Sequence, residues 1–164
     1  MIVIVMGVSG SGKTTIGELL ARRLRWEFRD GDDLHPPANI AKMKSGMPLD
    51  DSDRRPWLKA MSEAIHGWLN DGTGVVLACS ALKAAYRDVL IVDPAVVKVV
   101  YLKAGFPLIQ SRLEARQGHF MPAELLQSQF DTLEEPHDAI VVDVSKPREE
   151  CVSHIVQALR AARS

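Results

Sequence analysis

The chain has 164 residues, of which 46% are hydrophobic, so it can bury the core of one domain of ordinary size. Its formal net charge of −1 excludes a global basic field that would attract nucleic acid or an acidic membrane surface. No apolar stretch approaches the ~18 residues that span a bilayer. Cys79 and Cys151 lie in apolar runs, as buried thiols of a reducing compartment do. We therefore expect one soluble, cytoplasmic domain over residues 1–164, with no nucleic-acid or membrane partner.

Short β-branched runs alternate with longer helical patterns along the whole chain. The apolar runs predict strands at residues 2–6, 26–30, 74–79, 96–102 and 139–144. Apolar spacings of three and four predict helices at residues 13–25, about 37–45, 53–70, 83–91, 106–116, 122–132 and 147–162. This alternation predicts a three-layer α/β fold with a parallel sheet flanked by helices. In such folds ligands bind at the carboxyl ends of the strands.

The first predicted strand runs directly into G-x-x-x-x-G-K-[ST] at residues 7–14, and a helical pattern follows. Strand, glycine-rich loop and helix in this order are typical of a phosphate-binding loop, in which backbone N–H groups cradle the phosphates of a nucleoside triphosphate. We expect Lys13 to reach the β- and γ-phosphates and Thr14 to ligate Mg²⁺. The residues expected to bind ATP here are Gly7, Val8, Ser9, Gly10, Ser11, Gly12, Lys13, Thr14 and Thr15. The alternative is a glycine-rich turn that matches by accident.

Three acids and a histidine follow the second predicted strand within residues 30–35. At the carboxyl end of a strand, one carboxylate can orient or deprotonate a substrate hydroxyl and another can hold Mg²⁺ through water. We assign Asp32 to the hydroxyl and Asp30 to the metal shell. A plain solvated loop is the alternative.

Candidate anion-binding and capping residues surround the next helices. Arg54 or Arg55 can bind an anionic substrate in bidentate geometry. Ser80, after the third strand, can cap the following helix, contact a ligand or do both. Lys83 and Arg87 share a helix face, which is either a solvated stripe or part of a site.

Arg112 and Arg116 share one face of the predicted helix 106–116, and a segment bounded by Gly118 and Pro122 follows. This pattern predicts a lid at about 116–123 that closes over the γ-phosphate and supplies positive charge. A plain helix connection is the alternative, and the role of His119 stays open between them. Ser145 is a candidate N-cap of the last helix, and Trp57 is interpreted as core packing.

Several motifs together resemble the gluconokinases, which are phosphate-loop kinases of sugar acids. The most restrictive are D-G-D-x-L-H-P at 30–36 and C-S-A-L-K at 79–83, in combination with the phosphate loop. The other matching runs are 39–43, 46–51, 53–58, 86–88, 101–103, 112–116 with 118–120, and 129–136. The resemblance extends from residue 2 to about residue 147, whereas residues 144–147, the expected adenine-side loop, are not a distinctive match.

The resemblance implies transfer of the ATP γ-phosphate to the 6-hydroxyl of D-gluconate, with Mg²⁺, on a five-stranded sheet of order 2-3-1-4-5 and commonly in a homodimer. It implies catalytic roles for Lys13, Asp32 and Arg116, and nucleotide or lid contacts for Arg112. The substrate region is expected at about 30–70. The implied gluconate-binding residues are Asp32, His35, Lys42, Arg54, Ser80, Arg87 and His119.

Two other functions share parts of this pattern. Another small-molecule kinase of the same fold can act on shikimate, a different sugar acid or a nucleotide, but C-S-A-L stands where shikimate kinases have three glycines. A nucleotide-dependent switch of the GTPase kind needs an Asn-Lys-x-Asp signature, which this sequence lacks.

Overall fold

A parallel β-sheet forms the centre of the molecule. The structure is a computed structural model, and it describes residues 1–116 and 123–163. The strands are β1 (Ile2–Met6), β2 (Glu27–Asp30), β3 (Val75–Ala78), β4 (Val97–Lys103) and β5 (Ile140–Asp143). Within the described ranges they pair in the order β2-β3-β1-β4-β5, and every pairing is parallel. The predicted fold class and strand order are confirmed.

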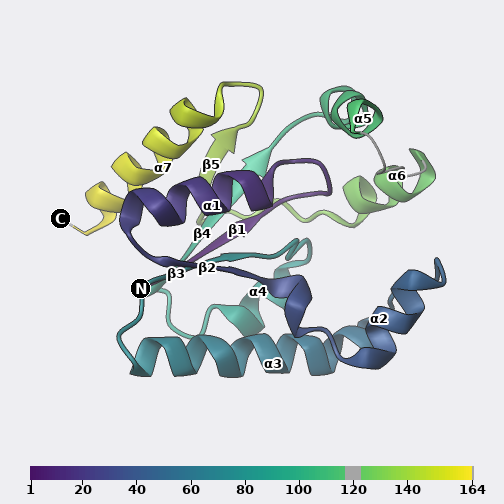
Figure 1. The fold of residues 1–164 in the computed structure, drawn as a ribbon, viewed down its shortest axis with the longest axis horizontal. Helices are drawn as coiled ribbons and strands as arrows, with labels where there is room; N and C mark the ends of the chain where they lie inside the picture. Colours follow the sequence, from purple (N-terminus) through teal and green to yellow (C-terminus); the bar gives the residue numbers. More distant parts are fainter. Residues whose placement is uncertain (117–122, 164) are drawn as a thin grey trace.

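Helices cover both faces of this sheet (Figure 1). They are α1 (Lys13–Leu24), α2 (Pro37–Lys44), α3 (Asp51–Asn70), α4 (Ala84–Leu90), α5 (Phe106–Ala115), α6 (Ala123–Thr132) and α7 (Arg148–Ala162). A short 3₁₀ helix, η1 (Gly31–Leu34), follows β2. Among the described helices, none combines the length and the apolar composition that crossing a membrane requires.

Strand β1 shows why the central strands read as continuous apolar runs. Its alternate side chains point to opposite faces of the sheet. Ile2, Ile4 and Met6 pack in the core beneath α3 and α4. Val3 and Val5 pack in a second core beneath α1 and α7. Both faces are therefore buried, and neither face of the strand can carry polar residues.

A third cluster of buried residues lies where α5 and α6 meet the phosphate loop. It contains Val8 of the loop, Ile109 and Leu113 of α5, Leu126 of α6, and Leu82 after β3. Because these residues come from different ends of the chain, the cluster fixes the loop relative to both helices and to the segment after β3.

The predicted strands and helices are confirmed, with ends that differ by at most two residues. Helix α3 begins two residues earlier than predicted because Asp50 caps it: the Asp50 carboxylate accepts the Asp53 N–H and the Asp53 carboxylate accepts the Asp50 N–H. The predicted N-caps were wrong. The residue at the cap position of α4 is Lys83 and not Ser80, and the Ala84 N–H is bound by the Glu134 side chain.

The last helix differs from its prediction in the same way. Its cap position is Pro147, because the Ser145 N–H and hydroxyl both donate to the Asp143 carboxylate in a turn directly after β5. The Ser145 hydroxyl is therefore hydrogen-bonded to Asp143 and caps no amide of α7.

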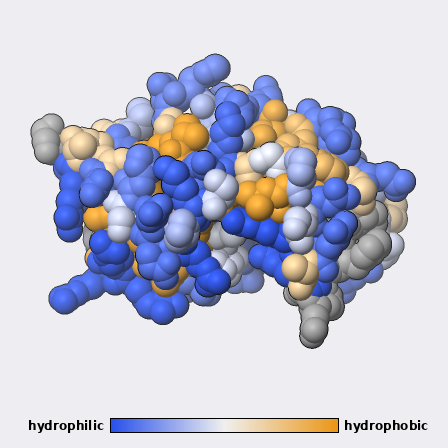
Figure 2. Space-filling view, turned by 90° about the horizontal axis from the view of Figure 1, so that it is seen from above, coloured by the Kyte–Doolittle hydropathy of each residue, from blue (hydrophilic) through white to orange (hydrophobic). Residues whose placement is uncertain are grey.

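Hydrophobic residues (orange) occupy separate areas of a largely hydrophilic surface in Figure 2. Helix α2 and the turn after it carry three exposed apolar side chains, Ile40, Met43 and Met47. Asn39 is the one fully buried residue of this helix. Polar contacts therefore make up much of what holds α2 to the rest of the domain.

Candidate active site

The phosphate loop connects β1 to α1. Gly10 and Gly12 have φ angles of 82° and 95°, a backbone region that L side chains rarely adopt. A Cβ at Gly10 would also lie 3.0 Å from the Leu113 side chain. Gly12 occupies the N-cap position of α1, so the first amides of this helix face the loop. The loop therefore has a backbone conformation that requires glycine at these two positions.

Lys13 is folded back onto the loop. Its Nζ donates to the carbonyl oxygens of Gly7 at 3.0 Å and Val8 at 3.1 Å. Burial lowers the pKa of the Lys13 amine, and the nearby Asp32 carboxylate opposes this shift. The ammonium has three N–H donors, so one remains for a phosphate while both of these bonds hold. Thr14 follows in the first turn of α1 and is exposed.

Strand β2 ends at Asp30, and Asp32 and Asp33 lie in η1 directly after it. The Asp30 carboxylate accepts the Asp32 N–H at 3.0 Å and thereby caps this short helix. The Asp32 side chain is 76% exposed, and the groups around it still remove part of the water from its carboxylate. Desolvation raises the pKa of the Asp32 carboxyl, and the adjacent Asp30 raises it further. Asp30 therefore orients the segment from which Asp32 projects.

His35 is held in one orientation by its neighbours. Its ring stacks on Trp57 with centroids 4.2 Å apart and an interplanar angle of 12°. The Asn39 Nδ2 donates to the Asp53 carbonyl at 2.8 Å and lies 3.2 Å from the His35 Nδ1. Because that amide nitrogen can only donate, Nδ1 accepts and Nε2 carries the proton. The Nε2 atom lies 3.9 Å from the Asp32 carboxylate.

Burial lowers the pKa of the His35 imidazole, and the Asp32 carboxylate opposes this shift. The neutral ring, with its N–H turned toward Asp32, is therefore the favoured form. Such a ring can donate a hydrogen bond to a ligand hydroxyl beside Asp32.

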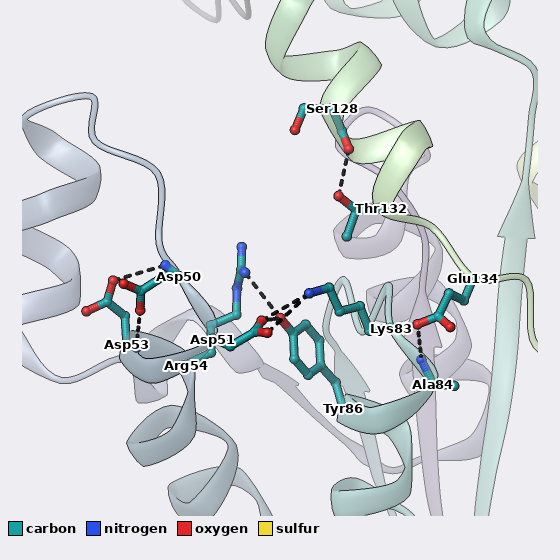
Figure 3. Close-up of polar contacts among 10 residues, drawn as sticks. All are labelled: Asp50, Asp51, Asp53, Arg54, Lys83, Ala84, Tyr86, Ser128, Thr132 and Glu134. Carbon is teal, nitrogen blue, oxygen red and sulfur yellow. Dashed lines mark hydrogen bonds and ion pairs between the residues drawn. The ribbon is translucent and has the colours of Figure 1, made fainter.

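Figure 3 shows Arg54 of α3 and Lys83, the residue before α4, beside Asp51 and Tyr86. The Tyr86 hydroxyl donates to the Asp51 carboxylate, and the Lys83 Nζ donates to the same carboxylate at 3.1 Å. Arg54 donates to the Tyr86 hydroxyl at 3.2 Å, and its guanidinium lies 5.6 Å from the centre of the Tyr86 ring. These hydrogen bonds hold the pKa of Asp51 below its usual value. Arg54 and Lys83 thus lie at this edge together with the Asp51 carboxylate, which neutralises part of their charge.

Lys42 connects α2 to this region. Its Nζ donates to the Asp53 carboxylate at 2.8 Å, and this contact raises the pKa of Lys42. Asp53 also closes the capping box of α3. One carboxylate therefore joins the start of α3 to the exposed helix α2.

Arg87 is buried, with 5% of its surface exposed, so the interpretation of a solvated stripe is wrong for this residue. Its guanidinium donates to the carbonyl oxygens of Ala81 at 2.7 Å, Leu82 at 3.1 Å and Glu134 at 2.7 Å. Ala81 has a φ of 44°, which is unusual for a residue with a side chain. Through its bonds to the Ala81 and Leu82 carbonyls, Arg87 thus stabilises the segment between β3 and α4. Its predicted contact with a substrate stays a prediction, as does that of the half-buried Ser80.

The two arginines of α5 have separate positions. Arg112 donates to the carbonyl oxygen of Val144, so it joins α5 to the segment after β5. Arg116 is exposed at the end of α5, and its charge lowers the pKa of Lys13. Residues 117–122, with His119 and most of the predicted lid, lie outside the described residues.

Known proteins resemble this chain over nearly its whole length. The family described as shikimate kinase matches residues 9–160. The thermoresistant gluconokinase of Escherichia coli is 42% identical, over 99% of this chain and 95% of its own. The gluconokinase of Gluconobacter oxydans is 50% identical, over 82% of this chain and 76% of its own. The chain belongs to the gluconokinase family.

Solved structures agree with this family assignment. A gluconokinase from Sinorhizobium meliloti superposes with a TM-score of 0.88 at 44% identity, covering 98% of this chain and 93% of its own. The shikimate kinase of Aquifex aeolicus, at 19% identity and a TM-score of 0.62, shares the fold over 98% of this chain and 97% of its own. The chain is therefore a gluconokinase-family member on the shikimate kinase fold.

The donor set of this gluconokinase-family site fits Mg²⁺ held largely by phosphates and water. In the described parts of the chain, no group of three His, Cys, Asp or Glu side chains is arranged to hold a metal ion. Mg²⁺ takes one or two protein ligands and keeps several waters when substrate phosphates are present. The exposed Thr14 hydroxyl beside the loop and the Asp30 carboxylate suit that pattern.

Sequence reasoning missed several residues of the site. Trp57, assigned to packing, supports both His35 and η1. Tyr86 and Asp51 organise the cations, and Asn39 selects the His35 tautomer. Gln129 of α6 is hydrogen-bonded to the phosphate loop. Asn39, Tyr86 and Gln129 all stand within runs that resemble the gluconokinases, but each partner is distant in the sequence, so spacing alone carried no signal for these contacts.

Proposed function

We propose that this protein transfers the γ-phosphoryl group of ATP to the 6-hydroxyl of D-gluconate, giving 6-phospho-D-gluconate and ADP. The relatives that carry the name gluconokinase support this acceptor. The observation that carries the proposal is that Lys13, after β1, and Asp32, after β2, both follow strands of one parallel sheet at its carboxyl edge, Lys13 in the phosphate loop and Asp32 on the acceptor side. Each of these two groups influences the pKa of the other. A donor phosphate and an acceptor hydroxyl bound at these residues would meet.

On the phosphate side, the loop of residues 7–14 holds the triphosphate through its N–H groups, together with Thr15. Lys13 contacts the β- and γ-phosphates with its remaining N–H donor. Mg²⁺, when bound to Thr14 and through water to Asp30, supplies positive charge that neutralises the phosphates. Arg116 adds charge at the transferring group, while Arg112 and residues 144–147 lie on the adenine side.

On the acceptor side, a sugar acid needs cations for its carboxylate and polar groups for its hydroxyls. Lys42, Arg54, Ser80 and Arg87 are the proposed contacts to gluconate along the edge formed by α2, α3 and the segment after β3. His35 donates its Nε2–H to a hydroxyl beside Asp32. His119 is proposed to join this set when the predicted lid at about 116–123 closes.

Asp32 orients the 6-hydroxyl and takes its proton as the oxygen attacks the γ-phosphorus. The bond between that phosphorus and the ADP oxygen breaks, and ADP leaves with the electron pair. A carboxylate is a weak base, so orientation of the hydroxyl contributes more than proton removal. The raised pKa of Asp32 moves this group in the direction that makes it a better base.

The first experiment measures ADP release with Mg-ATP against D-gluconate, other aldonic acids, shikimate, nucleoside monophosphates and no acceptor. Turnover with gluconate well above all others supports the proposal. Turnover with a different acid keeps the phosphate machinery but reassigns the acceptor residues. ATP hydrolysis that ignores every acceptor contradicts a kinase function altogether and favours a nucleotide switch or binding module.

We also propose that the protein works in the cytoplasm as a homodimer. The support is the resemblance to gluconokinases and the burial of both cysteines, Cys79 and Cys151, as free thiols. Light scattering coupled to size-exclusion chromatography measures the mass directly. A mass of one chain of 18.1 kDa across the working concentration range contradicts the dimer.

A further inference from the structure

Helix α6 is hydrogen-bonded to the phosphate loop through Gln129, in addition to the apolar cluster that its Leu126 shares with Val8. Its Oε1 accepts the backbone N–H of Ser9 at 2.7 Å, and its Nε2 donates to the Ser9 Oγ at 3.0 Å. The two residues are 120 positions apart in the sequence. These two bonds close a ring between one amide side chain and one residue, which fixes both the backbone and the side-chain rotamer of Ser9.

This ring decides which way the Ser9 hydroxyl can donate. Its oxygen already accepts a proton from the Gln129 Nε2, so its own hydrogen must point elsewhere. Within residues 1–116 and 123–163, no acceptor for that hydrogen is found. The carbonyl of the preceding residue, Val8, holds the Lys13 amine, so the hydroxyl and the ammonium lie on adjacent parts of the loop. Both are donors suited to the same anion.

The segment directly after α6 is anchored to the acceptor side of the site through Glu134. The Glu134 side chain accepts the Ala84 N–H at 3.1 Å, its N–H donates to the Leu82 carbonyl at 2.8 Å, and its carbonyl accepts from Arg87. Figure 3 shows Glu134 beside Ala84 at the start of α4, below the Ser128 and Thr132 turn of α6. Gln129 therefore lies on a helix that is tied at its end to the segment after β3 and at its middle to the phosphate loop.

We propose that Gln129 is a positioning residue that aims the Ser9 hydroxyl at the terminal phosphate of the bound nucleotide. The inference rests on the proposed use of ATP. The amide group of Gln129 holds the oxygen of Ser9, and the hydroxyl hydrogen is left to donate to a γ-phosphate oxygen next to Lys13. Because a diphosphate has no oxygen at that position, this contact separates ATP from ADP.

The test compares the affinities of ADP and of a non-hydrolysable ATP analogue, AMP-PNP, by calorimetry in the absence of acceptor. Gln129→Leu keeps the size of the side chain but removes both bonds. We expect it to weaken AMP-PNP binding about tenfold, as the loss of one hydrogen bond to a charged group does, and to change ADP binding less than about twofold. Ser9→Ala is expected to give the same selective loss.

The double variant supplies the decisive comparison. If Gln129 acts through the Ser9 hydroxyl, Gln129→Leu adds no further loss of AMP-PNP affinity in the Ser9→Ala background. The matched control is Gln127→Leu, two residues earlier on α6, because the Gln127 side chain is exposed and bonds to Asp131 of its own helix. It should leave both affinities unchanged.

Two results would overturn the inference. If Gln129→Leu weakens the binding of ADP and of AMP-PNP equally, the residue only holds the loop in shape. If the losses of AMP-PNP affinity add in the double variant, Gln129 acts independently of Ser9. Failure of the proposed function is distinguishable, because it appears in the wild type as ADP release that does not respond to gluconate. A wild type that binds neither nucleotide contradicts both.

Discussion

The indole Nε1 of Trp57 donates to the carbonyl oxygen of Gly31 at 2.8 Å. This bond joins α3 to η1, the segment that carries Asp32, and the same indole stacks on His35. Trp57 is 3% exposed, so water cannot replace the bond if it is lost. A residue of the core thus holds two proposed acceptor-side residues in place.

Trp57→Phe should keep the stacking but lose the bond to Gly31. We expect the unfolding free energy to fall by about 1–3 kcal/mol and KM for gluconate to rise severalfold, with KM for ATP unchanged. Trp68→Phe, on the same helix, is the control for the loss of indole volume. An equal rise of both KM values would show that Trp57 supports the fold in general and not the acceptor side.

Asp32→Asn should separate activity from stability. The raised pKa of Asp32 means that the folded protein binds the proton more tightly than the unfolded chain does, so the ionised carboxylate disfavours the folded state at neutral pH. We expect kcat to fall by about 10²–10⁴-fold, with AMP-PNP affinity nearly unchanged.

The stability of the Asp32→Asn variant is expected to equal or exceed that of the wild type at neutral pH. The difference should vanish on acidification below the ordinary carboxyl pKa of 3.8, where Asp32 is protonated in both states. Urea titrations at several pH values measure this. A near-normal kcat would remove Asp32 from the mechanism.

His35 should make the protein less stable in mild acid. Its pKa lies below the ordinary 6.5, so the neutral ring favours folding. That contribution is present above pH 6.5 and is lost as the pH falls through the lowered pKa of the folded state. Unfolding free energies between about pH 7.5 and about pH 5 should therefore drop more in the wild type than in His35→Gln. Parallel curves for the two proteins would contradict this.

Arg87→Ala should destabilise the fold, because three backbone carbonyls lose their donor at once. We expect a loss of about 2–4 kcal/mol in unfolding free energy, measured in urea. Arg22→Ala, on an exposed position of α1, is the matched control and should change stability by less than about 0.5 kcal/mol. Equal effects of the two substitutions would show that the Arg87 contacts contribute little.

Cys79 should be chemically inert in the folded protein. Burial raises the pKa of its thiol to about 12, and Cys151 is buried as well. Titration with Ellman's reagent at about pH 8 should therefore find essentially no reactive thiol in the native state, since the thiolate is the reacting species. In denaturant the same assay should find both of the chain's two cysteines. A thiol that reacts rapidly in the native protein would contradict this burial.

The elements that the sequence predicts well are those whose cause is local. The apolar run of β1 and the glycines of the phosphate loop each depend on neighbours within a few residues, and both are confirmed. Helix N-termini were predicted less well, because a capping side chain can bind another partner and a helix amide can be bound by a side chain from elsewhere in the chain. The Asp143 carboxylate accepts from Ser145, and the side chain of Glu134, in the segment after α6, accepts from the first amide of α4.

By itself the sequence determined the fold class, the strand order through its resemblance to known kinases, and the positions of Lys13 and Asp32 at the ends of two strands. Only the tertiary structure decided what surrounds them. It buries Arg87 against the segment after β3 and stacks His35 on Trp57. It also brings Gln129 to Ser9, where the two residues form hydrogen bonds. Periodicity and glycine chemistry act along the chain and can be read from it. Hydrogen bonds between residues up to 120 positions apart arise only when packing of the hydrophobic core brings those residues together.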